Sequence, residues 1–464
     1  MKTVLLTGAT GTMGAAGLKE LLKQKEFKVK LLVRPSKKNK KKLQYLHNNP
    51  SVEIIWGDLT NFDDVLKSVT DSDYVLHVGG MVSPNADFYP EKTYKVNVDA
   101  AKNIVNAILA QPNADDIKLV YIGSVSQTGF YNWPNVYGQI GDRIETADFD
   151  QYAASKVEAE RIIAESGIKH WVSLRQTSIL YPEIIKNGYT PTIFHVPLQG
   201  CLEWVTVEDS GRLLANVCQD SVPESFWNNF YNVSSGKDFR MTNYEFECRL
   251  LKALRCPKPE AIFNANWFAL QNFHGQWYND SDVLDDILHF RSNVSKDDYF
   301  ESIGKRVPAI FSLSKLFPHI VKLAMKHLAH HKMLGTMTWI KSNDKERIKA
   351  YFGSYKDWEE IPSWKQLDRT KYVWASGKAY KTEDLQHDNT QKFNKLKSDD
   401  KYELTDMQAI AEERGGRCLS QKMTKGDMVT KLKWQCESGH IFEASPKLIV
   451  KGGYWCKECL NRKD

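Results

Sequence analysis

The chain has 464 residues, of which 42% are hydrophobic and 26% charged, and its formal net charge is +6. Such a length suggests two to three domains of about 150 residues each, with a sizeable buried core. The modest charge gives no indication of a polyanionic partner, and no uninterrupted apolar run is long enough to span a bilayer.

A glycine-rich turn lies near the start of the chain, between a predicted buried strand over residues 2–7 and a predicted helix over residues 15–25. Glycines permit a tight turn here and let the backbone approach a pyrophosphate at a helix N-terminus. Because the first strand begins at residue 2, we expect no signal or transit peptide before it. The candidate cofactor-binding residues of the turn are Thr7, Gly8, Thr10, Gly11, Thr12, Met13 and Gly14.

Further along, Tyr152 and Lys156 stand four residues apart in a predicted helix. This spacing places both side chains on one helix face, so an ammonium group can lie beside a phenol. A nearby positive charge favours the phenolate and lowers the pKa of a tyrosine from its usual value of about 10. We therefore expect Tyr152 to exchange protons near neutral pH.

Together with the glycine turn, this pair makes residues 1 to about 240 resemble the extended short-chain dehydrogenase/reductase family of nicotinamide-dependent enzymes. Further segments fit in the same order: Trp56-Gly57-Asp58-Leu59 near the adenine, Val78-Gly79-Gly80 beneath the cofactor, Val96-Asn97-Val98 at a helix start, Tyr121-Ile122-Gly123-Ser124 on the serine strand, and Leu174-Arg175-Gln176 on the strand after the catalytic helix. The resemblance implies an α/β fold with a Rossmann-type doubly wound parallel sheet, but it names no substrate.

The resemblance also implies a role for each catalytic residue. Tyr152 would pass a proton to or from the substrate oxygen while hydride moves to or from the nicotinamide. Lys156 would hold the nicotinamide ribose, and Ser124 would hydrogen-bond the reacting oxygen. Ser126 is the reserve serine, because Gly123 stands where the family often has a second small hydroxyl residue.

The implied cofactor contacts outside the turn leave some alternatives open. Asp58 either bonds the adenine amine or caps a helix over residues 60–69, and Asn97 either lies at the cofactor or caps the long helix that follows. The remaining implied contacts are Leu59, Gly79, Gly80, Tyr152 and Lys156.

The end of the second predicted strand, residues 28–33, bears on the choice of cofactor. Family members that prefer NAD usually carry an acid there to bond the ribose 2′-hydroxyl. Here Arg34 follows the strand, and an arginine can hold a 2′-phosphate bidentately. We therefore expect NADP(H), with NAD still open, and we interpret Lys40 to Lys42 as a solvated loop.

Residues 220–380 carry no motif that can be tied to chemistry. Their aromatic residues predict either an apolar wall for a medium-sized substrate or ordinary core packing: Phe226, Trp227, Phe230, Tyr231, Phe263, Trp267, Phe268, Phe273, Trp277 and Tyr278. Residues 310–340 read as a basic, amphipathic helix pair, which suits a membrane surface or a lid. Packing against the reductase lobe explains the pattern more simply, so we do not expect membrane contact.

The C-terminal cysteines predict a structural zinc site. Cys436 and His440 form one closely spaced ligand pair, and Cys456 and Cys459 form another, with Cys418 as a spare. The surrounding pattern resembles a zinc-ribbon domain. Four protein ligands would close the metal to catalysis. Lysines with Trp434 and Trp455 could form a basic aromatic face for nucleic acid, but balancing acids make a structural or protein-docking role at least as reasonable. The lysines are Lys422, Lys425, Lys431, Lys433, Lys447 and Lys451.

Four segments are predicted: a catalytic Rossmann-type domain over 1–240, a mostly helical substrate lobe over 241–380, a polar linker over 381–402, and the zinc ribbon over 403–464. The other four of the eight cysteines are scattered and read as reduced thiols, which favours a cytoplasmic enzyme. The family resemblance leaves a homodimer open.

Our first functional hypothesis is an NADP(H)-dependent carbonyl reductase or alcohol dehydrogenase acting on a medium-sized, apolar substrate. Two alternatives stay open. One is a nucleotide-sugar epimerase or dehydratase that holds NAD tightly. The other is an NADP-sensing binding protein that signals through its zinc module.

Overall fold

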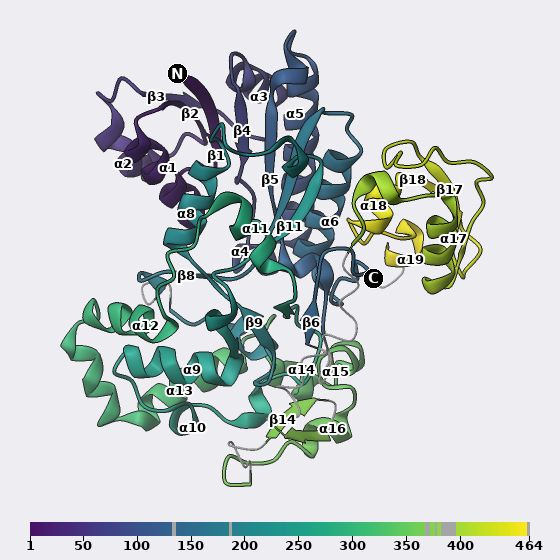
Figure 1. The fold of residues 1–464 in the computed structure, drawn as a ribbon. Helices are drawn as coiled ribbons and strands as arrows, with labels where there is room; N and C mark the ends of the chain where they lie inside the picture. The colour runs from purple at the N-terminus through teal and green to yellow at the C-terminus, as the bar shows by residue number, and fades with distance from the viewer. Residues whose placement is uncertain (132–135, 185–187, 367–371, 376–377, 382–395, 462–464) are drawn as a thin grey trace.

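The computed structural model describes residues 1–131, 136–184, 188–366, 372–375, 378–381 and 396–461 (Figure 1). Its centre is a seven-stranded sheet with the order β11-β7-β5-β4-β1-β2-β3, and all neighbouring strands run parallel. The strands are β1 (Lys2–Thr7), β2 (Phe27–Val33), β3 (Val52–Trp56), β4 (Tyr74–His77), β5 (Lys118–Ser124), β7 (His170–Gln176) and β11 (Asn229–Val233). The expected Rossmann-type doubly wound sheet is therefore confirmed.

Helices cover both faces of this sheet, which is why its strands are nearly continuous apolar runs. One face packs against α3 (Phe62–Val69), α5 (Pro90–Leu109) and α6 (Gln151–Ala164). The other packs against α1 (Thr12–Gln24), α8 (Val207–Asn216) and α11 (Ser281–Leu288). The strand order reverses between β1 and β4, and open α/β sheets bind their ligands at such a switch point.

The local predictions are accurate at β1 and less so at the helices. The strand begins and ends as predicted, but α1 starts at Thr12 rather than Ala15, so Gly14 belongs to its first turn. The predicted helix start at Asn97 is wrong. Helix α5 begins at Pro90, whose fixed φ suits the first helical position, so Asn97 lies inside it.

The substrate lobe is rich in helices, as predicted (Figure 1). Its helices are α9 (Asn243–Ala253), α10 (Pro259–Ile262), α12 (Lys296–Lys305), η8 (Ala309–Lys315), α13 (Pro318–Ala329), α14 (Thr336–Ser342), α15 (Lys345–Phe352) and α16 (Tyr355–Glu359). Short strand pairs join the lobe to the sheet: β6 (Tyr137–Gly138) with β13 (Trp277–Tyr278), β8 (Ile179–Leu180) with β10 (Val205–Thr206), and β9 (Cys201–Glu203) with β12 (Arg240–Thr242).

The C-terminal module is built on a three-stranded antiparallel sheet of β16 (Arg417–Cys418), β17 (Leu432–Gln435) and β18 (Ile441–Ala444). Its helices are α17 (Leu404–Glu413), α18 (Pro446–Val450) and α19 (Lys457–Asn461). Helix α17 ends at Glu413, and Gly415 adopts a left-handed φ of 75° just after it.

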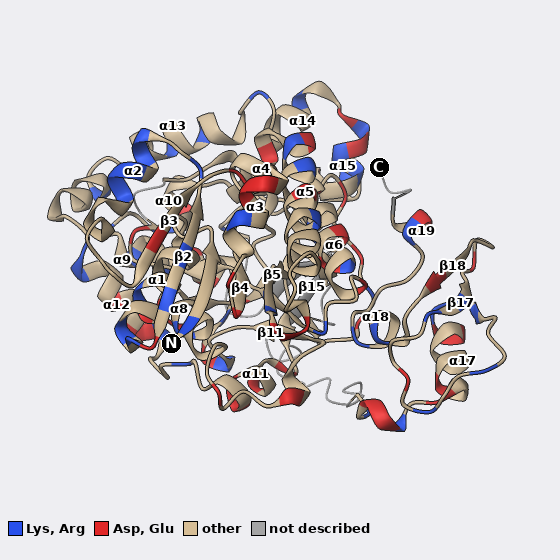
Figure 2. Ribbon diagram, turned by 90° about the horizontal axis from the view of Figure 1, so that it is seen from above, with Lys and Arg blue, Asp and Glu red and all other residues tan. Residues whose placement is uncertain are grey.

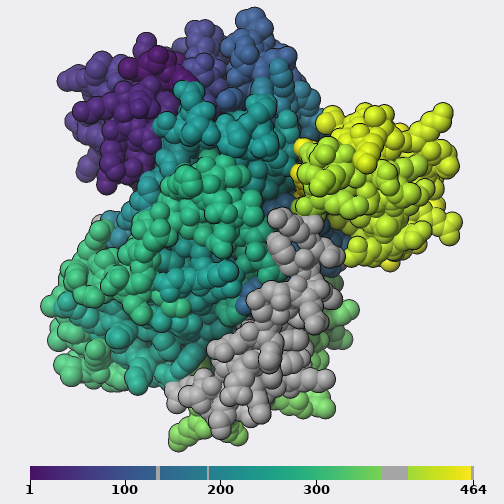
Figure 3. All heavy atoms as spheres, in the orientation of Figure 1, coloured from purple at the N-terminus to yellow at the C-terminus, as the bar shows by residue number. Residues whose placement is uncertain are grey.

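This module lies against the side of the Rossmann-type part and shares one apolar core with it (Figure 3). The contact is tightest at α6, where the Tyr454 hydroxyl donates to the Val157 carbonyl at 2.8 Å and to Glu160 Oε1 at 3.0 Å. Arg175 on β7 donates to Glu160 Oε1 and to the Gly452 carbonyl, each at 2.6 Å. The buried Glu160–Arg175 pair therefore joins a sheet strand, a helix and the C-terminal module.

The four predicted segment boundaries stay predictions. Residues 382–395 of the predicted linker lie outside the described residues. No helix in the described part of the chain is both long enough and apolar enough to cross a lipid bilayer.

Candidate active site and metal centre

The glycine turn has the geometry of a phosphate cradle. Gly8 has a φ of 72°, and a Cβ there would lie 2.8 Å from the Gly79 nitrogen. A Cβ on Gly14 would lie 2.2 Å from the Gly8 carbonyl oxygen. Only glycine fits at either position, so the backbone stays bare at the N-terminus of α1, where a helix favours anions. The residues of the turn from Gly8 to Gly14 line a large cavity.

Basic side chains line the same cavity beyond β2. Arg34, Lys38 and Lys42 all lie on its wall, and Lys42 Nζ donates to the Thr10 carbonyl at 2.7 Å. Ser36 caps the short helix α2 (Lys37–Leu43). Lys40 to Lys42 are therefore helical, and the loop prediction is wrong. The wall at the end of β2 could hold an additional phosphate.

The ends of β3 and β4 supply the next part of the wall, including Asp58, Leu59, Gly79 and Gly80. The capping alternative for Asp58 is wrong, because Asn61 caps α3 and Asp58 Oδ1 instead accepts from the Thr60 backbone and hydroxyl.

Two predicted cofactor residues lie behind the wall rather than on it. Thr7 is fully buried, and its hydroxyl accepts from the Gly79 nitrogen at 2.9 Å. Asn97 accepts from the Met81 nitrogen at 2.8 Å and donates to Ser155 Oγ at 2.9 Å. Both side chains brace the segment after β4.

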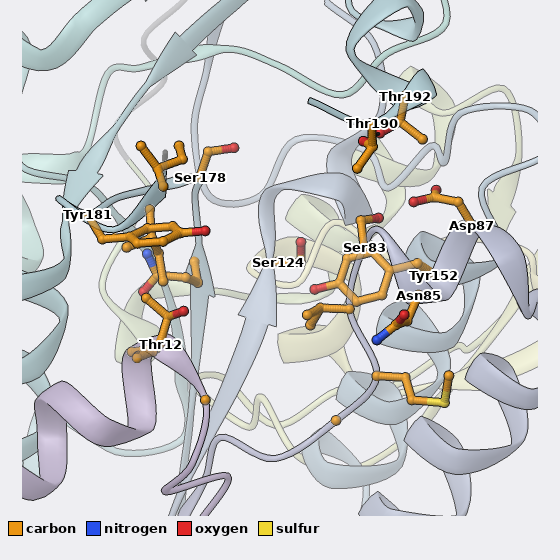
Figure 4. Close-up of a pocket in the computed structure, with 18 of the residues that line it drawn as sticks. Thr12, Ser83, Asn85, Asp87, Ser124, Tyr152, Ser178, Tyr181, Thr190 and Thr192 are labelled. Atoms are coloured by element: carbon orange, nitrogen blue, oxygen red, sulfur yellow. Dashed lines mark hydrogen bonds between the residues drawn. The ribbon is translucent and has the colours of Figure 1, made fainter. Parts of the chain in front are cut away.

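The three predicted catalytic residues meet at the carboxyl edge of the sheet. Figure 4 shows Tyr152 beside Ser124, and the Ser124 side chain hydrogen-bonds Tyr152. Lys156, one turn along α6 from Tyr152, donates from Nζ to the Ile122 carbonyl at 2.8 Å. The reserve serine, Ser126, is fully buried and donates to Ser124 Oγ at 2.9 Å, so it supports Ser124 from behind.

The expected lowering of the Tyr152 pKa is wrong for this structure. Burial disfavours the phenolate and raises the pKa of Tyr152 to about 12, and Asp150 and Asp87 add to the rise. Burial also lowers the pKa of Lys156 to about 8. The sequence could not reveal this, because desolvation depends on the surrounding chain.

Several polar residues near Tyr152 were not predicted. Figure 4 places Ser83, Asn85 and Asp87 around the tyrosine ring, and Thr190 and Thr192 beside them. Asp87 is mostly buried, and its Oδ2 has no hydrogen-bond partner within the described residues. The only sequence signal was the polar run that follows the Gly79-Gly80 strand end.

The cavity has a volume of about 1500 Å³. Ligand pockets usually measure about 300–1000 Å³, so this one has room for a dinucleotide and a second molecule. Among the described wall residues from 176 onward there is no lysine or arginine. Much of that half is apolar, and its apolar side chains include Trp204, Phe246, Leu250, Leu251, Leu254, Ile262, Phe311, Val321 and Met325.

The aromatic residues predicted for this wall lie mostly elsewhere. Of the ten, Phe273 lines the cavity. Phe226, Phe263, Phe268 and Tyr278 are fully buried core side chains. The alternative of ordinary core packing therefore holds for most of them.

Three further polar residues interact with other groups of the protein. Arg175 is fully buried and pairs with Glu160. His195 lines the cavity, but its Nε2 lies 2.8 Å from the Leu334 carbonyl, and burial lowers its pKa to about 4. Asp209 is buried and pairs with Arg212.

The C-terminal module brings the four predicted metal ligands together. The ligand atoms of Cys436, His440, Cys456 and Cys459 all lie within 4.8 Å of one another. Measured to His440 Nδ1, the sulfurs of Cys436, Cys456 and Cys459 lie at 3.3, 3.4 and 3.3 Å. A tetrahedral zinc site has S···N edges of about 3.6 Å, so this group could hold such an ion. Cys418 is not a member of the group.

Only part of the predicted basic aromatic face is open to solvent. Trp434 is fully buried in the core. Lys447 and Lys451 both pair with Asp399, and Lys431 pairs with Glu165 of α6. These three lysines stabilise the module and its contact with the Rossmann-type part, whereas Lys422, Lys425 and Lys433 are exposed.

Comparison with known proteins supports the assignment of the fold. Residues 4–182 match the model of the NAD dependent epimerase/dehydratase family. A UDP-glucose 4-epimerase from Rickettsia bellii is 31% identical over 110 residues, and one from Rickettsia massiliae is 29% identical over 112 residues. Each match covers 23% of this chain and only 32% or 33% of the relative, so the chain spans about a third of the length of these curated relatives.

Solved structures share the fold at low sequence identity. A dTDP-glucose 4,6-dehydratase from Streptomyces venezuelae, with NAD bound, has a TM-score of 0.52 at 15% identity, covering 66% of this chain and 96% of its own. A UDP-glucuronic acid 4-epimerase from Bacillus cereus, in complex with UDP-glucuronic acid and NAD, has a TM-score of 0.52 at 16% identity, covering 68% of this chain and 100% of its own.

Proposed function

We propose that the protein is a nicotinamide-dependent enzyme that moves hydride at a carbinol or carbonyl carbon of a small molecule. Residues 4–182 match the model of the NAD dependent epimerase/dehydratase family, which supports this proposal. One observation carries the proposal. The Ser124 and Tyr152 side chains meet in the same cavity that the glycine cradle lines. A reacting oxygen at Tyr152 and a dinucleotide on the cradle would share one space.

The side chains divide the proton chemistry between them. Because the pKa of Tyr152 is raised to about 12, its phenol stays protonated at neutral pH and can donate to a developing alkoxide. Ser124 would hydrogen-bond the same oxygen and stabilise its charge. Lys156, tied to the Ile122 carbonyl, would bind the cofactor ribose beneath. When bound, the nicotinamide ring supplies or accepts the hydride.

The cofactor preference rests on the residues at the end of β2. Arg34 and Lys38 suit the 2′-phosphate of NADP(H), and the other cavity residues at this strand end are uncharged or basic. The similar solved structures contain NAD. Arg34 favours NADP(H) here, and NAD is the alternative.

Two reaction types use this chemistry. The family match and the similarity to UDP-glucose 4-epimerases favour a nucleotide-sugar epimerase or dehydratase, in which the cofactor is reduced and reoxidised within one cycle. The cavity wall favours the second candidate, an NADP(H)-dependent reductase or dehydrogenase with an apolar substrate. A substrate diphosphate would find no lysine or arginine among the described wall residues from 176 onward.

We also assign a zinc ion to Cys436, His440, Cys456 and Cys459. Four protein ligands complete a tetrahedral site, so the metal would be structural rather than catalytic. Glu458 lies 3.4 Å from His440 Nε2 and would orient the imidazole. Whether the enzyme is a dimer stays a prediction.

Native mass spectrometry of the purified full chain tests these assignments together. Retained NAD, with conversion of UDP-glucose or dTDP-glucose, supports the epimerase or dehydratase. Exchangeable NADP(H), with NADPH oxidation by aliphatic or aryl ketones, supports the reductase. A protein that binds neither dinucleotide contradicts the hydride-transfer proposal, and a chain without stoichiometric zinc contradicts the metal assignment.

A further inference from the structure

The outer surface of η8 and α13 is unusually apolar for a solvent-facing surface. Six large side chains there are between 51% and 68% exposed. Single exposed apolar residues are normal, but a group of this size along one segment marks an interaction site. We call this group the apolar face; it consists of Ile310, Leu313, Leu316, Phe317, Ile320 and Leu323.

Helix α13 carries apolar residues on two sides. Val321, Met325 and Leu328 recur at helical spacing and pack against the core of the substrate lobe, which fulfils the expected packing role. Ile320 and Leu323 point away from that core and are exposed. A helix that is apolar on two sides normally has both sides covered by other parts of the protein. On the outer side of α13, no described segment covers Ile320 and Leu323.

Along the chain, the charge around the apolar face has a single sign. From residue 302 to residue 343 the sequence contains no aspartate or glutamate. The same stretch contains seven cations: Lys305, Arg306, Lys315, Lys322, Lys326, Lys332 and Lys341. Figure 2 shows the lysines of α13 in blue at the edge of the molecule. Lys305 and Arg306 pair with Glu301 and Glu183. Lys315, Lys322 and Lys326 form no ion pair within the described part of the chain, so they are available to an external anion.

The same segment forms part of the cavity wall. Phe311, Val321 and Met325 face the cavity alongside the apolar residues of α9. The inner side of η8 and α13 therefore borders the proposed substrate space, while the outer side carries the apolar face.

Contrary to the expectation from the sequence, we propose that the apolar face docks onto an anionic lipid bilayer. Apolar side chains flanked by lysines are the composition of helices that lie in a membrane interface, where each lysine gains from anionic headgroups. A second copy of the chain fits poorly, because two such faces would bring like charges together. An apolar substrate dissolved in the bilayer could then enter beside α13; this entry route rests on the proposed function, whereas the docking does not.

Vesicle sedimentation with the full chain tests the docking directly. We expect the protein to bind vesicles of equimolar phosphatidylcholine and phosphatidylserine, to stay in solution with phosphatidylcholine alone, and to be released by salt. Lys322→Gln with Lys326→Gln lowers the affinity by about thirtyfold, since each lysine near an anionic surface contributes about fivefold. Leu316→Gln with Leu323→Gln lowers it by about tenfold or more.

A control variant uses an exposed apolar side chain elsewhere. Val429 in the C-terminal module is 75% exposed, and Val429→Gln should bind vesicles like the wild type. Equal binding by all variants, or no binding to the mixed vesicles, overturns the proposal. So does a dimer in solution that Leu316→Gln with Leu323→Gln converts to monomer, because a second copy would then cover the face. Loss of catalysis alone would leave the vesicle result unchanged, so failure of the two proposals is distinguishable.

Discussion

Replacing Glu160 by glutamine should destabilise both the catalytic helix and the C-terminal module. Glu160 and its partner Arg175 are both fully buried. The carboxylate accepts from Arg175 Nη2 at 2.6 Å, from Arg175 Nε at 3.1 Å and from the Tyr454 hydroxyl at 3.0 Å. Glutamine has nearly the same shape as glutamate but carries no charge. Its amide group also places a hydrogen-bond donor beside the donors of Arg175 and Tyr454.

The expected loss of unfolding free energy follows from the burial of the Glu160–Arg175 ion pair. Breaking a buried ion pair on one side costs about 3–5 kcal/mol, because the remaining charge is left without compensation. Arg175 Nη1 already has no hydrogen-bond partner in the described part of the chain, so no spare acceptor can take over. We therefore expect Glu160→Gln to lower the unfolding free energy by about 3–5 kcal/mol.

The assay is guanidinium unfolding of the zinc-loaded protein, followed by tryptophan fluorescence and by zinc release to a chromogenic chelator. Both midpoints should fall together, because Tyr454 and the ligand Cys456 lie in one short segment. Glu158→Gln is the matched control on the same helix. Its partners, Arg161 and Lys457, are partly exposed, so the cost should stay within about 1 kcal/mol. Equal effects of the two variants would refute the reasoning.

Four further outcomes are expected. Tyr152→Phe lowers kcat by about 10²–10⁴-fold at unchanged dinucleotide affinity, whereas Tyr45→Phe, at an exposed phenol, keeps wild-type turnover. Arg34→Ala weakens NADPH binding by about tenfold and leaves NADH binding nearly unchanged, as fluorescence titration would show; equal losses would contradict the phosphate role. Cys456→Ser abolishes stoichiometric zinc by elemental analysis and lowers the melting temperature. Burial lowers the pKa of His77 to about 3. Below about pH 6.5 the unfolded chain therefore binds more protons than the folded chain, so stability falls as the pH drops toward 3. His77→Gln should flatten this dependence of the melting temperature on pH.

Short sequence patterns made the catalytic half of the molecule predictable. The apolar run of β1 and the glycines after it specify a strand and a turn within a dozen residues, and both lie where expected. The spacing of Tyr152 and Lys156 likewise places them on one helix, and the four metal ligands follow from two short spacings.

Features that depend on distant residues were not predictable. The raised pKa of Tyr152 comes from burial by chain segments far from it in sequence. Asn97 was misplaced because the signal for its helix start, Pro90, lies seven residues earlier. The composition of the C-terminal module does not distinguish an exposed Trp434 from a buried one. The packing of the folded module shows that Trp434 fills its core.

The hydrogen bond from Arg175 to the Gly452 carbonyl spans 277 positions of the chain, and this separation constrains folding during synthesis. At about 5–20 residues per second, a ribosome needs roughly 15–55 seconds to add that many residues. During this interval β7 has left the ribosome, but its arginine still lacks one of its native acceptors. The edge of the parallel sheet next to β11 can therefore reach its final packing only after the C-terminal module has been made.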